Sequence, residues 1–248
     1  VVLGVELGMT LVESAHGNRL SVWRVDAMPT HNVLLEMRIN KVRECLDNLA
    51  SQVEDNLRTV LGNMESQAPA PIQELQKVME SAQATRASCL LLIGRQFPVA
   101  RDLRYAMAAI RVEHDYERVE ELTEALNRRI HYLRDTPMQG VLKNMAGVMR
   151  GIVKLHQVVK QTWQRTGDNP TLPDLKNEVV GESKSIQSGI SAIQSEAIEK
   201  IARVDGSAEM SVELVLACRH LKRIALLMEA IPEELHAFDA QQSPVMTS

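Results

Sequence analysis

The stretch Met210–Phe238 decides the fold class, and it reads MSVELVLACRHLKRIALLMEAIPEELHAF. Its apolar residues recur every three or four positions, which is the spacing of one face of an α-helix. The members of this series are Met210, Leu214, Ala217, Leu221, Ile224, Met228, Ile231, Leu235 and Phe238. A long helix with one apolar stripe buries that stripe against other helices. The stretch therefore predicts one long helix of a bundle.

The same spacing extends over most of the preceding chain. It runs from Leu35 to Met64, from Met138 to Val159 and from Leu175 to Ile201, and the segments 72–96 and 99–134 are apolar over a wider arc. Breaks that contain proline or glycine separate the six segments. Helices of this length favour an elongated bundle over a compact ball. The sequence therefore predicts an all-α fold with six helices.

The chain also resembles itself weakly. A shift of 105 positions places Arg118 on Arg223 and aligns the apolar positions around them. Three of the six segments lie on each side of the central break. We therefore predict two tandem three-helix units, residues 32–134 and residues 138–240.

Residues 1–31 do not join this pattern. Hydrophobic residues in 1–12 and 20–25 alternate loosely on either side of a turn at His16-Gly17-Asn18, which is typical of a two-stranded ribbon. An isolated ribbon is only marginally stable in water. We expect this segment to be an appendage, either a short β ribbon or disordered.

The composition excludes several classes of function. The chain has 28 Lys and Arg against 32 Asp and Glu, a net charge of −4, so no basic surplus is present to bind a nucleic-acid backbone. Cys45, Cys89 and Cys218 lie far apart without a Cys-x-x-Cys pair, which fits buried thiols in a reducing compartment. No apolar run approaches the roughly 18 residues that a transmembrane helix needs. We expect a cytoplasmic protein that does not bind nucleic acid.

The densest group of acidic residues lies at 113–124. On a helix, four of its glutamates form one stripe: Glu113, Glu117, Glu120 and Glu124. Carboxylates one turn apart, such as Glu117 and Glu121, can hold a hard cation or a cluster of iron or manganese; the alternative is a solvated charged face. Asp115 falls within the apolar arc of the same helix, so we expect it to be partly buried and paired.

Two further groups of residues are candidates for a metal or ion-pair site. Glu182 replaces an apolar residue of the fifth segment, and pairing with a Lys or Arg of a neighbouring helix is the favoured interpretation. Glu233 and His236 have the Glu-x-x-His spacing of di-iron bundles, but the sequence lacks the second motif that such a site needs. The common nucleotide-binding, hydrolase and zinc-protease motifs are also absent from the sequence. We therefore predict a binding or regulatory protein and no enzyme.

Two stretches carry a resemblance to a known family. They are Arg95–Arg104, RQFPVARDLR, and Ala109–Glu121, AIRVEHDYERVEE. They resemble the PhoU family of phosphate-uptake regulators, in which a loop reading approximately Gln-Pro-Val-Ala-x-Asp-Leu-Arg leads into a helix with Arg-Ile-x-x-Asp-Leu-Glu-Arg-Ile-Gly-Asp. Here Phe97 is inserted, Tyr116 stands for Leu, and Glu120-Glu121 stand for Gly-Asp. The division into two three-helix units also looks like that family, so the resemblance covers about residues 32–240.

The resemblance implies a regulatory function. PhoU-like proteins are cytoplasmic and keep the phosphate-starvation response off when phosphate is plentiful. They act with the ATPase of the phosphate transporter and with a sensor histidine kinase, so they lie near the membrane through these partners; a homodimer is left open. The residues we expect at the partner surface are Arg101, Asp102, Arg104 and Arg118.

The resemblance also implies a metal site. Some PhoU-like proteins bind iron, zinc or other metals through paired Glu/Asp-x-x-x-Asp motifs. Glu117 and Glu121 match this motif, with Asp115 beside them, so one degenerate site for Fe, Mn or Zn is expected in the first unit. Lys222 and Leu226 occupy the acidic positions in the second unit, and neither can bind a hard cation.

Two other interpretations remain open from the sequence. One is a cytosolic PhoU-like module of a sodium–phosphate transporter system. The other is a metal-binding helical bundle, including a metal-dependent bundle enzyme.

Overall fold

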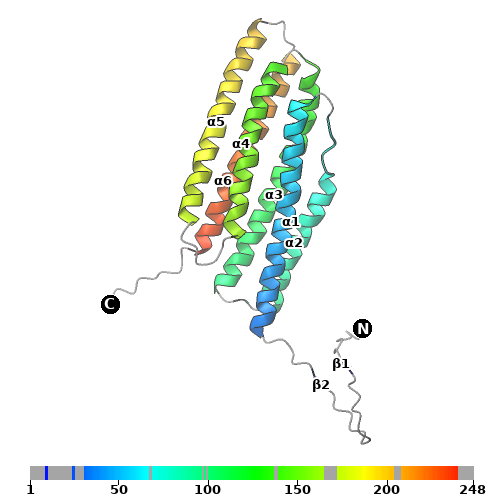
Figure 1. Ribbon diagram of the computed structural model, residues 1–248, viewed down its shortest axis with the longest axis vertical. Helices are drawn as coiled ribbons and strands as arrows, with labels where there is room; N and C mark the ends of the chain where they lie inside the picture. Colours follow the sequence, from blue (N-terminus) through cyan, green and yellow to red (C-terminus); the bar gives the residue numbers. More distant parts are fainter. Residues whose placement is uncertain are drawn as a thin grey trace, which may run out of the picture.

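Six long helices make up the protein. The computed structural model describes residues 9–10, 24–25, 31–66, 69–96, 98, 100–136, 139–164, 172–203 and 208–239. The helices are α1 (His31–Glu65), α2 (Leu75–Gln96), α3 (Ala100–Arg134), α4 (Gln139–Gln164), α5 (Leu172–Arg203) and α6 (Ala208–Asp239). They lie side by side along the long axis of the molecule (Figure 1). The predicted elongated, all-α, six-helix bundle is confirmed.

The helices form two sets of three. In the first half of the chain α1, α2 and α3 pack on one another, and in the second half α4, α5 and α6 do the same. The two sets meet mainly through α3 against α6 and through α1 against α4. This arrangement is the predicted pair of tandem three-helix bundles.

Two short strands precede the bundle. β1 (Met9–Thr10) pairs antiparallel with β2 (Arg24–Val25), with Met9 opposite Val25. The pair falls within the segments in which the alternation indicates a ribbon. The rest of residues 1–30 lies outside the described residues, so the extent of the predicted appendage stays a prediction.

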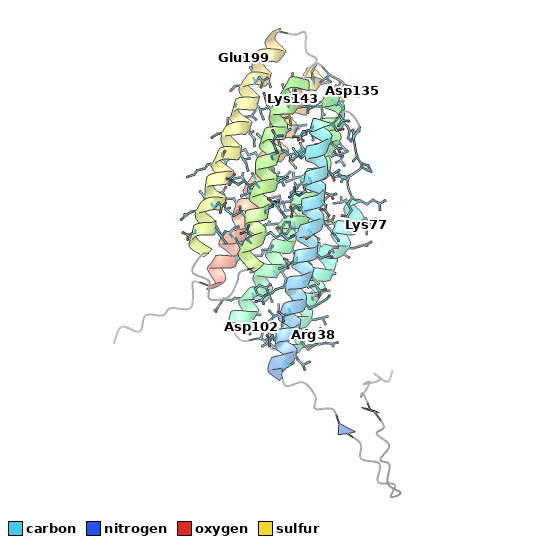
Figure 2. The ribbon with its side chains drawn as sticks, in the orientation of Figure 1. Arg38, Lys77, Asp102, Asp135, Lys143 and Glu199 are labelled. Atoms are coloured by element: carbon cyan, nitrogen blue, oxygen red, sulfur yellow. The ribbon has the colours of Figure 1, made fainter. Side chains whose placement is uncertain are left out.

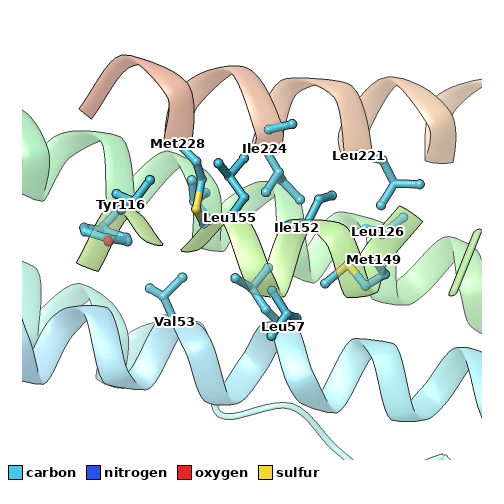
Figure 3. Packing of buried hydrophobic residues seen from close by; sticks show 14 of the residues in the cluster. Val53, Leu57, Tyr116, Leu126, Met149, Ile152, Leu155, Leu221, Ile224 and Met228 are labelled. Carbon is cyan, nitrogen blue, oxygen red and sulfur yellow. The ribbon is translucent and has the colours of Figure 1, made fainter. Parts of the chain in front are cut away.

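The periodic apolar residues form the core. Every member of the series from Met210 to Leu235 is at most 8% exposed, because α6 packs on α3, α4 and α5. Burial of each large aliphatic side chain stabilises the fold by about 1.5–3 kcal/mol. Figure 3 shows how α1, α3, α4 and α6 contribute to the same core, with Val53, Leu57, Tyr116, Leu126, Met149, Ile152, Leu155, Leu221, Ile224 and Met228.

Two glycines allow α4 and α5 to approach closely. A Cβ at Gly189 would lie 2.9 Å from Cγ2 of Val148, and one at Gly151 would lie 3.0 Å from Cγ1 of Ile186. Both distances are shorter than ordinary van der Waals contact. Glycine at these positions therefore sets the spacing of the two helices.

α2 is shorter than its neighbours. It has 22 residues, whereas α1 and α3 have 35 residues each and are about 50 Å long. The residues that connect α1 to α2 run along the side of the bundle before α2 begins (Figure 1). We call the described part of this connection, residues 69–74, the strap.

The state of the cysteines and the character of the described helices agree with two expectations from the sequence, buried thiols and no transmembrane helix. Cys89 and Cys218 are buried, Cys45 is half-buried, and all three are free. Among the described helices, none combines the length and the apolar character needed to cross a membrane.

Candidate functional site

The acidic stripe of α3 faces the interior of the first unit. Glu113 and Glu120 have no exposed surface, and Glu117 has only 16% of its side chain exposed. Glu113 and Glu120 are therefore not part of a solvated charged face, whereas the side chain of Glu124 is 35% exposed and Glu121 is exposed. Buried carboxylates need hydrogen-bond donors or a cation, and here other helices supply them.

Arg86 of α2 supplies the cation. Its guanidinium donates to both carboxylate oxygens of Glu113, with Nε to Oε2 at 3.0 Å and Nη2 to Oε1 at 2.7 Å. The same Nη2 donates to Oε2 of Glu117 at 2.9 Å. Burial raises the pKa of Glu113, and the guanidinium beside it acts in the opposite direction. One arginine thus joins α2 to two turns of α3.

Glu120 is held by an amide instead of a cation. Nδ2 of Asn56 donates to its Oε1 at 2.6 Å, and within the described residues its Oε2 has no hydrogen-bond partner. Burial raises the pKa of Glu120 to about 7, although the Asn56 hydrogen bond favours the ionised form. Glu120 therefore titrates near neutrality inside the first unit.

Two asparagines of α1, Asn56 and Asn63, bind the strap. Oδ1 of Asn56 accepts from the backbone N–H of Gln73 at 2.7 Å. Two helical turns later, Oδ1 of Asn63 accepts from the N–H of Ala70 at 2.8 Å, and its Nδ2 donates to the Ala70 carbonyl at 2.9 Å. Nδ2 of Asn63 also donates to Oδ1 of Asn127 at 2.9 Å. The polar interior of the first unit thus fixes the strap to α1 and α3.

The spacing of these contacts explains why they repeat. Seven residues of a helix rise about 10.5 Å, and three residues of an extended chain span about 10 Å. Asn56 and Asn63 therefore meet the backbone of Gln73 and Ala70 in register. A single asparagine in an amphipathic helix does not predict such a contact. The seven-residue spacing of Asn56 and Asn63 within the apolar face was the one feature of the sequence that could have indicated it.

The predicted metal ligands are not brought together as a cluster. Glu117 is bound to Arg86, Glu121 is exposed, and Asp115 is half-buried. Burial raises the pKa of Asp115, whereas the positive charges of His114 and Arg118 lower it. In the part of the chain that the structure describes, no group of three His, Cys, Asp or Glu side chains is arranged to hold a metal ion.

The side chains present therefore do not fit a metal cluster on this motif. The chemistry of the donors agrees, because the guanidinium of Arg86 already binds both Glu113 and Glu117 from the side of α2. A metal at Glu117, Glu121 and Asp115 stays a prediction that these contacts do not support. Glu182, by contrast, forms the expected structural pair, since it accepts a hydrogen bond from Lys154 of α4.

The residues predicted for partner binding are spread along α3. Asp102 and Arg104 lie in its first turns, at the end of the bundle where α1 also begins, near Arg38 (Figure 2). Arg118 is half-buried about 20 Å further along the helix. The side chain of Arg101 lies outside the described residues. These four residues do not form one compact patch, and their role stays a prediction.

Sequence reasoning missed a polar group between the two units. His156 of α4 has no exposed surface and packs edge-on against Tyr116 of α3, with ring centroids 5.6 Å apart. Its Nδ1 lies 3.8 Å from Oε2 of Glu54. The other oxygen of Glu54, Oε1, accepts from Arg58 at 2.7 Å and from Gln157 at 3.1 Å. Burial lowers the pKa of His156 to about 4. The imidazole is therefore neutral at pH 7.

A second polar contact joins the units through α3 and α6. Arg129 donates to Glu213, and its Nε donates to Nε2 of His220 at 3.1 Å. Burial lowers the pKa of His220, and so do the guanidinium groups of Arg129, Arg219, Arg223 and Arg128. His220 thus accepts a hydrogen bond as a neutral ring.

Comparison with known proteins supports the fold. No protein-family model matches the chain, and no curated protein matches its sequence. A solved structure does match: the crystal structure of PhoU from Pseudomonas aeruginosa. The TM-score is 0.71 at 16% sequence identity, over 84% of this chain and 100% of that chain. This chain therefore has a PhoU-like fold.

Proposed function

We propose that this protein is a PhoU-like cytoplasmic regulator of phosphate uptake and of the phosphate-starvation response. It acts by contact with the ATPase of the phosphate transporter, with the sensor histidine kinase, or with both, and it catalyses no reaction. The observation that carries the proposal is the PhoU-like fold over the whole length of the matched PhoU structure. The loop and helix motifs at 95–104 and 109–121 support it from the sequence.

The internal chemistry of the first unit fits this proposal better than the metal-binding alternative. Arg86 forms hydrogen bonds with Glu113 and Glu117, whose carboxylates a metal ion would otherwise bind. The remaining polar groups, such as Asn56 and Asn63, hold helices and strap together. We therefore assign the function to the outer surfaces of the bundle and not to an interior site.

Direct binding tests the proposal. The purified full chain would be measured by biolayer interferometry against the transporter ATPase and the cytosolic part of the sensor kinase from the same organism. We expect saturable binding to at least one of them. The triple variant Arg101→Ala/Asp102→Ala/Arg104→Ala tests the predicted surface on α3, and Lys77→Ala, at an exposed position of α2, is its control. Absence of binding to both partners would contradict the proposed mode of action.

A further inference from the structure

The outer face of α6 carries an unusual stripe of exposed residues. Val212, Val215 and Leu226 are 53%, 57% and 43% exposed, although large aliphatic side chains of the other face of α6 are fully buried. Arg219 and Lys222, also exposed, occupy the positions between them. The five residues are spaced by three and four, so they form one line about 20 Å long on the helix surface.

The centre of the stripe is positively charged. Arg219, Lys222 and Arg223 are exposed and form no ion pair with any residue that the structure describes. Between Val212 and Leu226 the sequence contains one acidic residue, Glu213, which Arg129 of α3 binds. The whole chain has a net charge of −4, so this local positive charge is not a general property of the surface.

A residue of α5 extends the apolar part of the stripe. Ser183 and Lys176 of α5 contact Glu229 and Glu233 of α6, which fixes an antiparallel register of the two helices. In this register Ile198 of α5, 69% exposed, lies at the level of Val212 and Val215. On the other side, Arg128 and Arg129 of α3 lie near His220 and are ion-paired with Glu124 and Glu213.

The stripe contains the two positions at which the second unit departs from the family motif. Lys222 and Leu226 stand where the acidic residues are expected, and both belong to the stripe. The first unit has Glu117 and Glu121 at the corresponding positions of α3. The second unit thus exchanges two acidic positions for a cation and an exposed apolar side chain.

We propose that the α6 face formed by Val212, Val215, Arg219, Lys222, Arg223 and Leu226 binds an acidic amphipathic helix of a partner protein. The exposed apolar side chains at the two ends of the stripe, Val212 with Val215 and Leu226, can contact the apolar face of another helix. Charge complementarity selects the occupant, because three cations at the centre attract Glu and Asp. A second copy of the same face would bring these cations against each other, and like charges repel. This inference deepens the proposed function, on which it rests for the nature of the partner.

A peptide of defined sequence tests the surface itself. The probe is a fluorescein-labelled helical peptide of about 20 residues, with Leu at the a and d positions and Glu at the e and g positions of each heptad. Its binding to the full chain would be measured by fluorescence anisotropy at low and high salt. We expect saturable binding that weakens with salt and is reduced at least tenfold by Arg219→Glu/Lys222→Glu/Arg223→Glu. The variant Val215→Ser/Leu226→Ser should also weaken binding.

The controls make the test decisive. Lys77→Glu removes an exposed cation from α2, which does not pack on α6, and should leave peptide binding unchanged; a peptide with Lys in place of Glu should not bind. All substitutions are on the surface, and circular dichroism checks that each variant is folded. The inference is overturned by equal binding of the charge-reversed variant, by no binding of the wild type, or by a dimer in sedimentation that Val215→Ser/Leu226→Ser abolishes.

A cellular measurement separates this inference from the proposed function. In a deletion strain, the wild-type chain and the Arg219→Glu/Lys222→Glu/Arg223→Glu variant would each be expressed with a phosphate-starvation reporter. Loss of repression only with the variant supports both proposals. Full repression with the variant overturns the docking face and leaves the proposed function intact. A reporter that does not respond to deletion contradicts the proposed function, while peptide binding still tests the face.

Discussion

Glu113 lies at 0% exposure, where an unpaired carboxylate would cost several kcal/mol. Arg86 offsets this cost with two hydrogen bonds to Glu113 and one to Glu117. The side chain of Arg86 is 41% exposed, so the pair is partly solvated and is worth less than a fully buried one. The contact therefore stabilises the packing of α2 on α3.

Removal of the guanidinium tests this role. Arg86→Met should lower the free energy of unfolding by about 2 kcal/mol, because it leaves a buried carboxylate without its cation. Urea unfolding followed by circular dichroism measures the change. Arg128→Met is the control, since Arg128 pairs with Glu124 on the surface and should contribute less than about 0.5 kcal/mol. Equal effects of the two substitutions would show that Arg86 does not stabilise the packing of α2 on α3.

His156 predicts a pH dependence of stability. Its pKa falls from 6.5 in the unfolded chain to about 4 in the fold, because the buried ring is held neutral. The groups that face it are Glu54 and Arg58 from α1, Tyr116 from α3 and Lys160 from its own helix. A depressed histidine pKa means that the unfolded state binds the proton first, so this contribution to stability is complete above pH 6.5 and is lost as the pH falls towards 4.

The size of the effect follows from the two pKa values. Between pH 7 and pH 4, His156 should account for about 3 kcal/mol of the loss in unfolding free energy. His156→Leu should remove this part of the slope, as measured by urea unfolding at a series of pH values. His131→Gln, at an exposed position of α3, should leave the slope unchanged. An identical slope for His156→Leu and the wild type would contradict the assignment.

At the scale of the elements, apolar periodicity was sufficient to locate the helices. The series from Met210 predicts α6, and its members up to Leu235 are buried. The polar residues in the same arcs could not be placed from the sequence, because a Glu, Asn or His at a core position is compatible with solvent, a metal or a partner side chain. The contacts of Glu120 with Asn56 and of His156 with Tyr116 join residues that are far apart in the sequence, so helical periodicity could not predict them.

The strap depends on Asn56 and Asn63 of α1. Asn63→Ala removes the partner of the Ala70 backbone and leaves Asn127 without one of its hydrogen bonds, so it should destabilise the fold by about 2 kcal/mol. It should also increase proteolytic cleavage between α1 and α2, detected by mass spectrometry. Asn48→Ala, at an exposed position of the same helix, is the control. Unchanged cleavage in Asn63→Ala would show that the strap is held by other contacts.

Because α4 and α5 approach closely at Gly189 but not at Gly181, alanine substitutions at these two glycines should change the free energy of unfolding in opposite directions. Gly189→Ala should lower the unfolding free energy by about 1 kcal/mol, since its Cβ would lie 2.9 Å from the stiff side chain of Val148. Gly181→Ala in the same helix has nothing within 4 Å of its Cβ, so it should raise stability by up to about 1 kcal/mol. Thermal unfolding of both variants measures the difference. A stabilising Gly189→Ala would contradict the packing of these helices.

At the scale of the whole molecule, the two units share a fold but differ in their use of charge. The first unit places its acidic residues inside, against Arg86 and Asn56. The second unit places cations on the outer face of α6, at Arg219 and Lys222. Sequence spacing predicted the tandem architecture, whereas the side on which each charge lies depends on how the helices rotate and pack.

The most direct test of the central claim is the phosphate-starvation response of a strain that lacks this protein. The gene would be deleted, and a starvation-controlled reporter would be measured in phosphate-rich medium. A PhoU-like regulator predicts a reporter that is active despite abundant phosphate and is repressed again when the full chain is restored. A reporter that stays repressed in the deletion strain would contradict the proposed function.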